Sequence, residues 1–461
     1  MAGLSSPGLG SGLDINGLVT QLVAAEKQAP QAQITRAQTG TVTTISALAN
    51  LKGALGGFNA ALDSLKTLDA FTGRTATADK PEFFTASATS KAAAGVYDIE
   101  VLQVASAHQI KSKEFATGAG QEVGTGTLTF TAGDKTFQVA IDAQHNTLAG
   151  IRDAINQATD NKDFVRATIV NASDGAHLVL SGTATGATNS ITVAQSGGDG
   201  GLSVLEYNPS QLTHYTEGRP AQDSIVSVAG FTKNSNTNTF TDVIDGITIN
   251  VVKADEGEIH KLTVATDQTA VTARIKTFVD QFNQMQSTIS GLRSYEPSTK
   301  KAGPLLGDAL LRGIESEIRG KLTDVNGGSG VFRTLASIGI TTQKDGSLTL
   351  DNAKLKSSLE SNYDEVAKLF GAENGVAARL SNAIAPRLAA GAELDVRSKS
   401  LNAKSVALQK QQTALEARML VVEQRYRKQF TALDSLLSNL QSQSTFLTQQ
   451  LSSISKIGGS S

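Results

Sequence analysis

The feature that most constrains the fold of this chain is a seven-residue repeat of apolar side chains near its C-terminus. One track of the repeat comprises Leu401, Leu408, Leu415, Val422, Gln429 and Leu436, and the other comprises Met419, Tyr426, Leu433, Leu440, Leu447 and Ile454. Two such interleaved tracks are typical of the seam of a coiled-coil helix. A continuous helix of about fifty residues spans roughly 80 Å, which is far more than a compact domain needs.

The N-terminal part of the chain carries helical patterns in two stretches. The first has Asp14 as its expected N-cap and Pro30 as its expected end, and its apolar residues are Ile15, Leu18, Val19, Leu22 and Val23. The second follows Pro30, ends near Gly73, and repeats apolar residues in steps of seven: Ile34, Leu48, Leu55 and Leu62 on one track, Leu51, Phe58 and Leu65 on the other. This spacing predicts a second coiled-coil seam.

The stretch between these helical ends has the pattern of β structure. From about Phe83 to Asp267 the sequence is rich in Thr, Ser, Gly and Val, and apolar residues alternate with polar ones. Residues 127–130 and 136–141 predict a hairpin, and residues 147–158 predict one helix. Because helical spacing returns at Val271, we expect an α+β multidomain fold. In that fold the N- and C-terminal arms form a helical coiled-coil trunk with inserted β-rich domains.

Composition excludes several classes of protein. The 461 residues include no cysteine, which rules out disulfides, thiolate nucleophiles and cysteine-ligated zinc. The 41 Lys and Arg nearly balance the 43 Asp and Glu, so no strong field attracts nucleic acid or an anionic membrane. The N-terminus lacks the pattern of a cleaved secretory signal, and no apolar run approaches the roughly 20 residues of a membrane helix. We therefore expect no nucleic-acid partner and no membrane insertion.

Residues that could support catalysis do not form a recognisable pattern. The histidines are scattered through the β region without the spacing of metal ligands: His108, His145, His177, His214 and His260. The glycine-rich residues 8–12 neither follow a strand nor carry the lysine of a P-loop, and we interpret them as a hinge. The sequence therefore predicts no catalytic residue, no cofactor and no metal site, so we do not expect an enzyme. The alternative in that class is a hydrolase that acts through Ser or Thr beside a histidine.

The apolar stripes at the two chain ends predict an oligomer interface. Residues 15–23 and 430–454 have apolar faces that a single molecule does not readily cover. The alternative is an intramolecular bundle, in which residues 34–68 pair with residues 271–292 and part of the C-terminal helix. We expect both ends to be disordered or frayed in an isolated subunit and to order against neighbouring chains. The predicted contacts are Ile15, Leu18, Leu22, Leu433, Leu437, Leu440 and Leu447.

Several stretches of the sequence resemble one known family. They are GLGSGLDINGLVTQLVAAEKQAP at residues 8–30, YDIEVLQVASAH at 97–108, TLAGIRDAINQA at 147–158, GPLLGDALLRGIESEIRGKL at 303–322 and QFTALDSLLSNLQSQSTFLTQQL at 429–451. Together these stretches resemble the bacterial flagellar filament-capping proteins, the hook-associated cap family FliD. They cover both chain ends and most of the middle.

The resemblance, combined with the patterns above, implies a set of domain boundaries. Residues 1–33 form a flexible N-terminal segment with an amphipathic helix, and residues 34–80 form the N-terminal arm of the trunk. Residues 81–105 and 223–266 form a first β domain, residues 106–222 a second, inserted β domain, residues 267–400 the C-terminal part of the trunk, and residues 401–461 the C-terminal coiled-coil helix.

The resemblance further implies a structural role at the distal end of the flagellar filament. In that role the chain forms a homo-oligomeric ring of about four to six subunits, promotes folding and insertion of exported flagellin, and is required for filament elongation and motility. The implied partners are other copies of the chain, flagellin, the hook-filament junction proteins and a flagellar export chaperone. The implied location is the filament tip, reached by secretion through the flagellar type III export channel. The alternative function is a surface adhesin that binds host mucin or glycans through its β domains. The resemblance to the cap family is compatible with an additional role in adhesion.

Overall fold

The computed structural model describes residues 14–162, 164–210, 212–324 and 330–457, and these divide into two compact units. The first unit joins the described residues up to Ala70 with those from Thr272 onward, and it is mainly helical. The second unit runs from Phe71 to Val271 and is mainly β structure. This arrangement confirms the predicted α+β multidomain fold with β-rich domains inserted between helical arms.

Helix α1 (Ile15–Asp63) starts at the predicted cap, where the Asp14 carboxylate accepts a hydrogen bond from the Gly17 N–H at 2.9 Å. The prediction that Pro30 ends this helix is wrong, because α1 continues through Pro30 without a break. A proline inside a helix costs about 3 kcal/mol. Here apolar residues on both sides of it, Val23 and Ile34, pack against the same partner cluster on α7 (Glu393–Ile457), and the Pro30 ring itself is exposed. Tertiary packing therefore outweighs the local preference of the proline.

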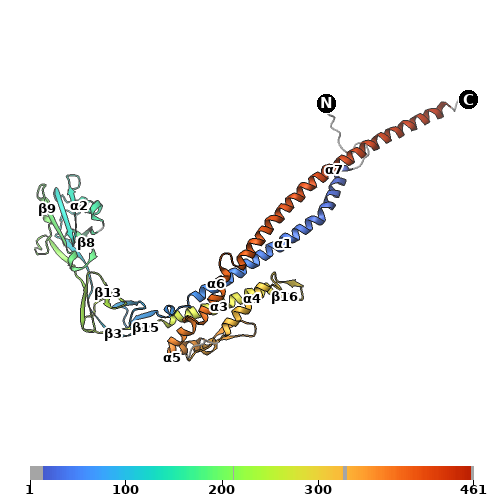
Figure 1. Cartoon of the computed structure of the whole chain (residues 1–461). Coiled ribbons are helices and arrows are strands. Elements are labelled where there is room, and N and C mark those ends of the chain that lie inside the picture. Colours follow the sequence, from blue (N-terminus) through green and yellow to red (C-terminus); the bar gives the residue numbers. More distant parts are fainter. Residues whose placement is uncertain (1–13, 163, 211, 325–329, 458–461) are drawn as a thin grey trace. The chain divides into compact units, whose positions relative to one another are not determined.

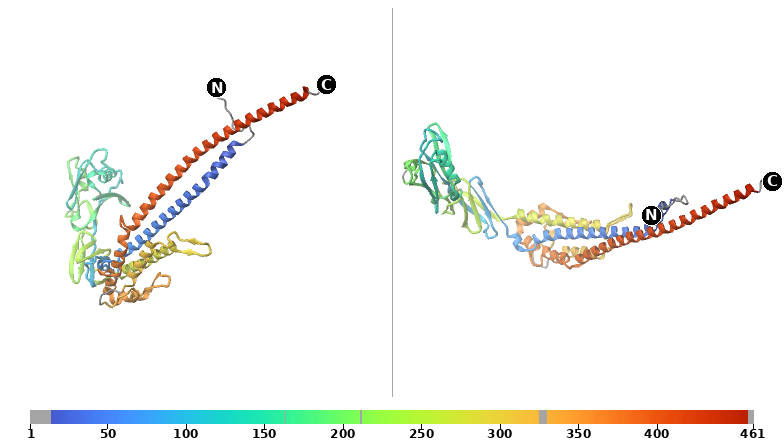
Figure 2. Two further views of the ribbon diagram at one scale, coloured as in Figure 1. Left: turned by 45° about the vertical axis from the view of Figure 1, so that its right-hand side comes forward. Right: turned by 90° about the horizontal axis from the view of Figure 1, so that it is seen from above.

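Helices α1 and α7 run antiparallel and side by side (Figure 1, Figure 2). Arg427 on α7 donates a hydrogen bond to Asn16 near the start of α1, and Gln412 pairs with Gln31 further along. The remaining helices of this unit are α3 (Gln268–Arg293), α4 (Ala309–Thr323), α5 (Asn352–Gly371) and α6 (Val376–Leu388). Its short strands are β16 (Tyr295–Glu296), β17 (Lys301–Ala302), β18 (Ile340–Thr342) and β19 (Leu348–Leu350).

The core at the C-terminal end of α1 follows the predicted heptads. Every predicted position from Leu48 to Leu65 is buried. The ring of Phe58 lies 5.6 Å from that of Phe278 and 5.5 Å from that of Phe282, centroid to centroid, so α3 packs directly on this seam. The trunk is therefore a helical bundle around the C-terminal end of α1, and a two-helix coiled coil of α1 and α7 toward the N-terminal end of α1.

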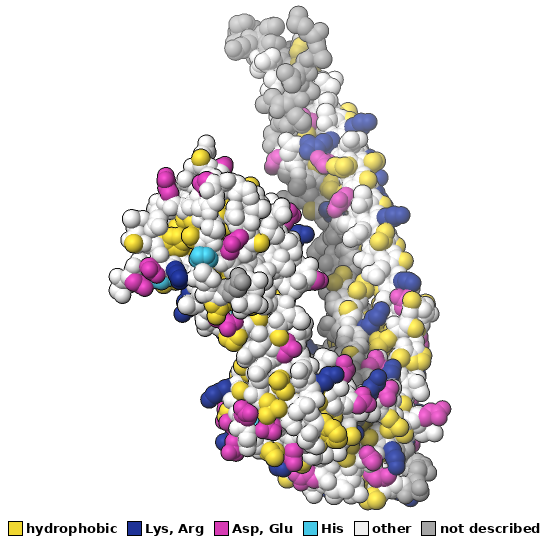
Figure 3. Space-filling model, turned by 90° about the vertical axis from the view of Figure 1, so that its left-hand side faces the viewer, with side chains coloured by type: hydrophobic (Ala, Val, Ile, Leu, Met, Phe, Trp, Pro, Cys, Tyr) yellow, Lys and Arg dark blue, Asp and Glu magenta, His cyan; other side chains and the backbone are white. Residues whose placement is uncertain are grey.

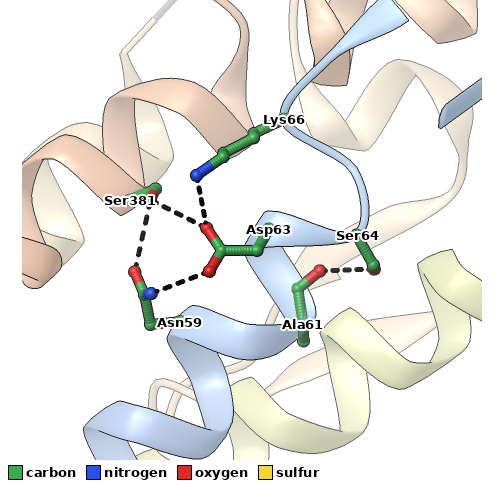
Figure 4. A network of polar contacts seen from close by, with 6 residues as sticks. All are labelled: Asn59, Ala61, Asp63, Ser64, Lys66 and Ser381. Atoms are coloured by element: carbon green, nitrogen blue, oxygen red, sulfur yellow. Dashed lines mark hydrogen bonds and ion pairs between the residues drawn. The ribbon is translucent and has the colours of Figure 1, made fainter. Parts of the chain in front are cut away.

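A polar network fastens the end of α1 to α6 (Figure 4). Asp63 accepts hydrogen bonds from Asn59 at 3.2 Å and from Lys66 at 2.8 Å. The hydroxyl of Ser381 on α6 is buried and lies within hydrogen-bond distance of the oxygens of both Asn59 and Asp63. Burying a hydroxyl is favourable only when it finds such partners, so this contact fixes how α6 meets the last turns of α1.

The β unit contains two hydrophobic cores among its described residues. The first core lies between a five-stranded sheet of order β1-β15-β3-β11-β12 and a three-stranded sheet of order β13-β14-β2, both antiparallel. Its central side chains include Phe84, Ile99, Ile249 and Leu262. The strands are β1 (Arg74–Ala78), β2 (Phe84–Ala88), β3 (Gly95–Gln103), β11 (Ser224–Val228), β12 (Phe231–Ser235), β13 (Thr239–Ile244), β14 (Ile247–Val251) and β15 (His260–Thr266).

The second core lies among a four-stranded sheet of order β10-β4-β8-β7, a three-stranded sheet of order β6-β5-β9, and helix α2 (Leu148–Gln157). The predicted hairpin is confirmed as β5 and β6, and the predicted helix as α2, which the Thr147 side chain caps through the Gly150 N–H. The strands are β4 (Ala107–Ser112), β5 (Gly126–Ala132), β6 (Lys135–Ile141), β7 (Val165–Ala172), β8 (Gly175–Thr185), β9 (Ile191–Ser196) and β10 (Tyr215–Arg219).

Candidate assembly surface

The surface of interest is the part of α7 that extends past the start of α1. The two helices pair as far as Asn16 and Arg427, and beyond that point no other described element of the helical unit runs beside α7 (Figure 1, Figure 2). The pairing therefore ends where α1 begins, although α7 continues to Ile457.

The paired region of α7 buries its heptad face against α1. Leu415, Met419 and Val422 form a small apolar cluster, and Val23, Ile34 and Tyr426 pack against it. These residues recur every three to four positions, so they lie along a single stripe of α7.

Polar pairs flank this cluster. The side-chain amides of Gln31 and Gln412 hydrogen-bond to each other in both directions, at 2.7 and 2.8 Å. The Tyr426 hydroxyl donates to the Glu26 carboxylate at 3.2 Å. Amides and hydroxyls that would otherwise lose water on packing are thus satisfied between the helices.

The same stripe continues beyond α1 without cover. Leu433 is 44% exposed, Leu440 is 53% exposed and Leu447 is 59% exposed, while Leu437 is half-buried. Leu433, Leu440 and Leu447 follow the buried Met419 in steps of seven residues. Leu437 lies four residues after Leu433 and three before Leu440, so it belongs to the same stripe. Since a fully buried Leu stabilises by about 1.5–3 kcal/mol relative to an exposed one, this stripe offers substantial binding energy to a partner.

The predicted contacts on α1 divide into two groups. Ile15 is only 2% exposed and Val19 is also buried, so the expectation that residues 15–23 remain unpaired is wrong for these side chains. Ile15, Val19 and Val23 follow each other at intervals of four and share one face of α1, whereas Leu18 and Leu22 lie off that face and remain 38% and 40% exposed. Only Leu18 and Leu22 remain available on this end of α1.

On the described part of α7 beyond Arg427, three large exposed apolar residues were missing from the predicted contacts: Leu436, Phe446 and Leu451. Leu436 belongs to a heptad track, and Leu451 follows Leu447 by four residues, so the periodicity already marks both. Phe446 is 60% exposed and lies off the stripe, so heptad spacing could not have indicated it.

The described residues do not suggest a metal centre or a membrane span. They contain no group of three or more His, Cys, Asp or Glu side chains that could hold a metal ion. No described helix is both long enough and apolar enough to cross a bilayer.

Four histidines, His108, His145, His177 and His260, each contact a carboxylate of the β unit. The glycine-rich residues 8–12 lie outside the described part of the chain. Acidic and basic side chains are interspersed over the face shown in Figure 3, in keeping with the net charge of -2.

Comparison with known proteins gives consistent matches. Family models described as the N-terminus and the C-terminus of flagellar hook-associated protein 2 match residues 11–108 and 221–442. The B-type flagellar hook-associated protein 2 of Pseudomonas aeruginosa PAO1 is 33% identical, over 98% of both chains. Flagellar hook-associated protein 2 of Escherichia coli K12 is 32% identical, again over 98% of both chains.

A solved structure also resembles this chain. The crystal structure of the D1-D2-D3 domains of the flagellar cap protein FliD from Escherichia coli superposes with a TM-score of 0.62 and 28% sequence identity. The match covers 77% of this chain and 99% of that one.

Proposed function

The chain belongs to the flagellar hook-associated protein 2 family, and from this premise we propose that its copies form a ring of about four to six subunits at the tip of the flagellar filament. It is a structural component of the flagellum, the filament cap. As a ring it promotes folding and insertion of exported flagellin, so filament elongation and motility depend on it. Its further partners are the hook-filament junction proteins and a flagellar export chaperone.

The observation that carries this proposal is the uncovered stripe of α7. Leu433, Leu440 and Leu447 continue a packed heptad face past the point where α1 begins. A contiguous exposed apolar surface on a soluble helix marks an interaction site. Helix packing on such a stripe gives the most direct way for several copies to associate through their trunks.

The composition of the chain supports delivery through the flagellar type III export channel. Passage through a narrow channel requires an unfolded chain, and a sequence without cysteine forms no disulfide that would obstruct it. The adhesin alternative gains no support from the names of these relatives, which are all flagellar.

Leu440→Asp tests the proposal, because a carboxylate in the middle of the stripe must be desolvated without a partner when helices pack there. We expect cells carrying this variant to lose swimming motility. Electron micrographs of the purified variant should show monomers where the wild-type protein forms rings. Circular dichroism should show the β unit still folded.

Leu212→Asp is the matched control, since Leu212 is 55% exposed against 53% for Leu440 but lies in the β unit. It should swim and assemble as the wild type does. Normal motility of cells with Leu440→Asp would refute the role of the stripe.

A further inference from the structure

The end of α7 differs from the rest of the helix in its charge. From Ser435 to Ser455 no residue is charged, over a length of roughly 30 Å. The preceding part of the same helix carries a charge every few residues: Lys399, Lys404, Lys410, Glu416, Arg418, Glu423, Arg425, Arg427 and Lys428. A helix normally carries charged residues on its back, the face opposite the apolar stripe, when that face is exposed to solvent. The change in composition therefore separates the charged part of α7, which is suited to solvent exposure, from the uncharged part that begins at Ser435.

The hydroxyls on the uncharged part are satisfied within the helix itself. Ser435, Ser442, Thr445 and Thr448 each donate a hydrogen bond to the backbone carbonyl four residues earlier, at 2.8 to 3.0 Å. Serine and threonine that bond their own helix in this way need no water and no partner side chain. These four hydroxyls can consequently be buried at little cost.

The back of the segment also carries an apolar side chain. Phe446 lies roughly opposite Leu440 and Leu451 around the helix and is 60% exposed. It lines a shallow groove together with Ser438, Gln441, Ser442, Thr445 and Gln449. An aromatic ring on the back gives that face apolar area to bury, independently of the leucine stripe.

We propose that the segment of α7 from Ser435 to Ser452, defined here as the terminal segment, is enclosed on all sides by the terminal segments of other copies of this chain. A charged partner surface would have to lose its water against an uncharged helix that returns no ion pair. Another terminal segment has no such cost, because it is equally uncharged and presents the same leucine stripe and the same four hydroxyls that bond their own helix. This inference rests on the proposed ring and deepens it, since the stripe alone requires contact on only one face.

Ser442→Lys tests the enclosure of the back. Ser442 lies away from the leucine stripe, and lysine is a better helix former than serine, so the isolated helix should not suffer. Sedimentation equilibrium of the purified full-length protein should show at least about a tenfold rise in the concentration needed for half-assembly, since the ammonium would be buried without a partner. Ser442→Ala should assemble as the wild type does, because the hydroxyl bonds only its own helix.

Thr413→Lys is the matched control. Thr413 is exposed on the charged part of α7 and bonds its own helix through the Gln409 carbonyl in the same way as Ser442. This variant should assemble normally. If Ser442→Lys also assembles normally while Leu440→Asp does not, the enclosure is overturned and the ring proposal stands. If both assemble normally, the role of the leucine stripe in assembly is refuted as well. A wild-type protein that stays monomeric at all concentrations would overturn self-enclosure and indicate flagellin as the occupant.

Discussion

At the scale of single residues, the neighbours of two histidines in the β unit shift their pKa values in opposite directions. The ring nitrogens of His177 lie 2.9 Å from the Ser112 carbonyl oxygen and 3.0 Å from an Asp174 carboxylate oxygen. Both partners only accept, so both nitrogens must carry protons for both bonds to form. The Ser112 carbonyl first, and then Asp174, raise the pKa of His177 above its ordinary value of 6.5.

His108 shows the reverse arrangement. Its Nδ1 accepts a hydrogen bond from the Ile191 backbone N–H at 2.9 Å, so this nitrogen must be unprotonated. Its Nε2 faces Glu217 at 3.2 Å and the Tyr207 hydroxyl at 3.5 Å. Burial lowers the pKa of His108, although Glu217 opposes this shift. The neutral ring thus ties β4 to β9, across the two sheets of the second core.

His177→Gln should therefore change stability in a pH-dependent way. Because the folded-state pKa of His177 is raised, its contribution is complete below about 6.5 and is lost as pH rises through the raised value. Thermal unfolding followed by circular dichroism should show the variant less stable than wild type near pH 5, with the difference closing toward pH 9.

His108→Gln is the counterpart. The lowered pKa of His108 makes its contribution fade on acidification, so this variant should flatten the decline at low pH. A difference between His177→Gln and wild type that does not vary with pH would contradict this assignment.

At the scale of elements, the α1–α7 coil combines a thin apolar seam with reciprocal amides. Gln31 and Gln412 each both donate to and accept from the other. Removing one amide leaves the side-chain carbonyl oxygen of the other without its donor in a half-buried position, whereas replacing both removes the requirement. The pair therefore suits a double-mutant cycle.

Gln412→Ala should lower the free energy of unfolding by about 0.5–1.5 kcal/mol, measured by urea denaturation. The double variant Gln31→Leu, Gln412→Leu should recover this loss or exceed wild-type stability, since two leucines extend the seam of Leu415 and Met419. A double variant as unstable as the sum of its single variants would show that the two amides act independently.

The sequence predicts individual elements well wherever local chemistry and tertiary packing agree. Thr147 caps α2, and the alternation on either side of Gly133 gives the β5–β6 hairpin. Pro30 misleads because its local cost is outweighed by Val23 and Ile34 packing on α7, contacts with residues almost four hundred positions away in sequence. Tertiary burial of this kind is invisible to a local pattern.

At the scale of the whole molecule, the order of helix, sheet and helix is readable from the change in apolar periodicity from about 3.6 to 2 and back. The candidate surface is only partly readable. The heptads identify Leu433, Leu440 and Leu447, yet they do not say where α1 stops covering α7. That limit depends on the antiparallel register fixed by contacts such as Arg427 with Asn16, and it explains why Ile15 is buried. The inserted residues 109–220 lie outside both family models.

The most direct test of the central claim is amide hydrogen exchange of the terminal segment, Ser435 to Ser452, in the monomer and in the assembled ring. In the monomer no described element of the helical unit covers this segment, so its amides should exchange much faster than those of Leu48 to Leu62 in the core of the trunk. In the ring they should become strongly protected, while the exchange of the β unit changes little. Equal protection of the terminal segment in both states would contradict the account, because the stripe would then be covered without any partner chain.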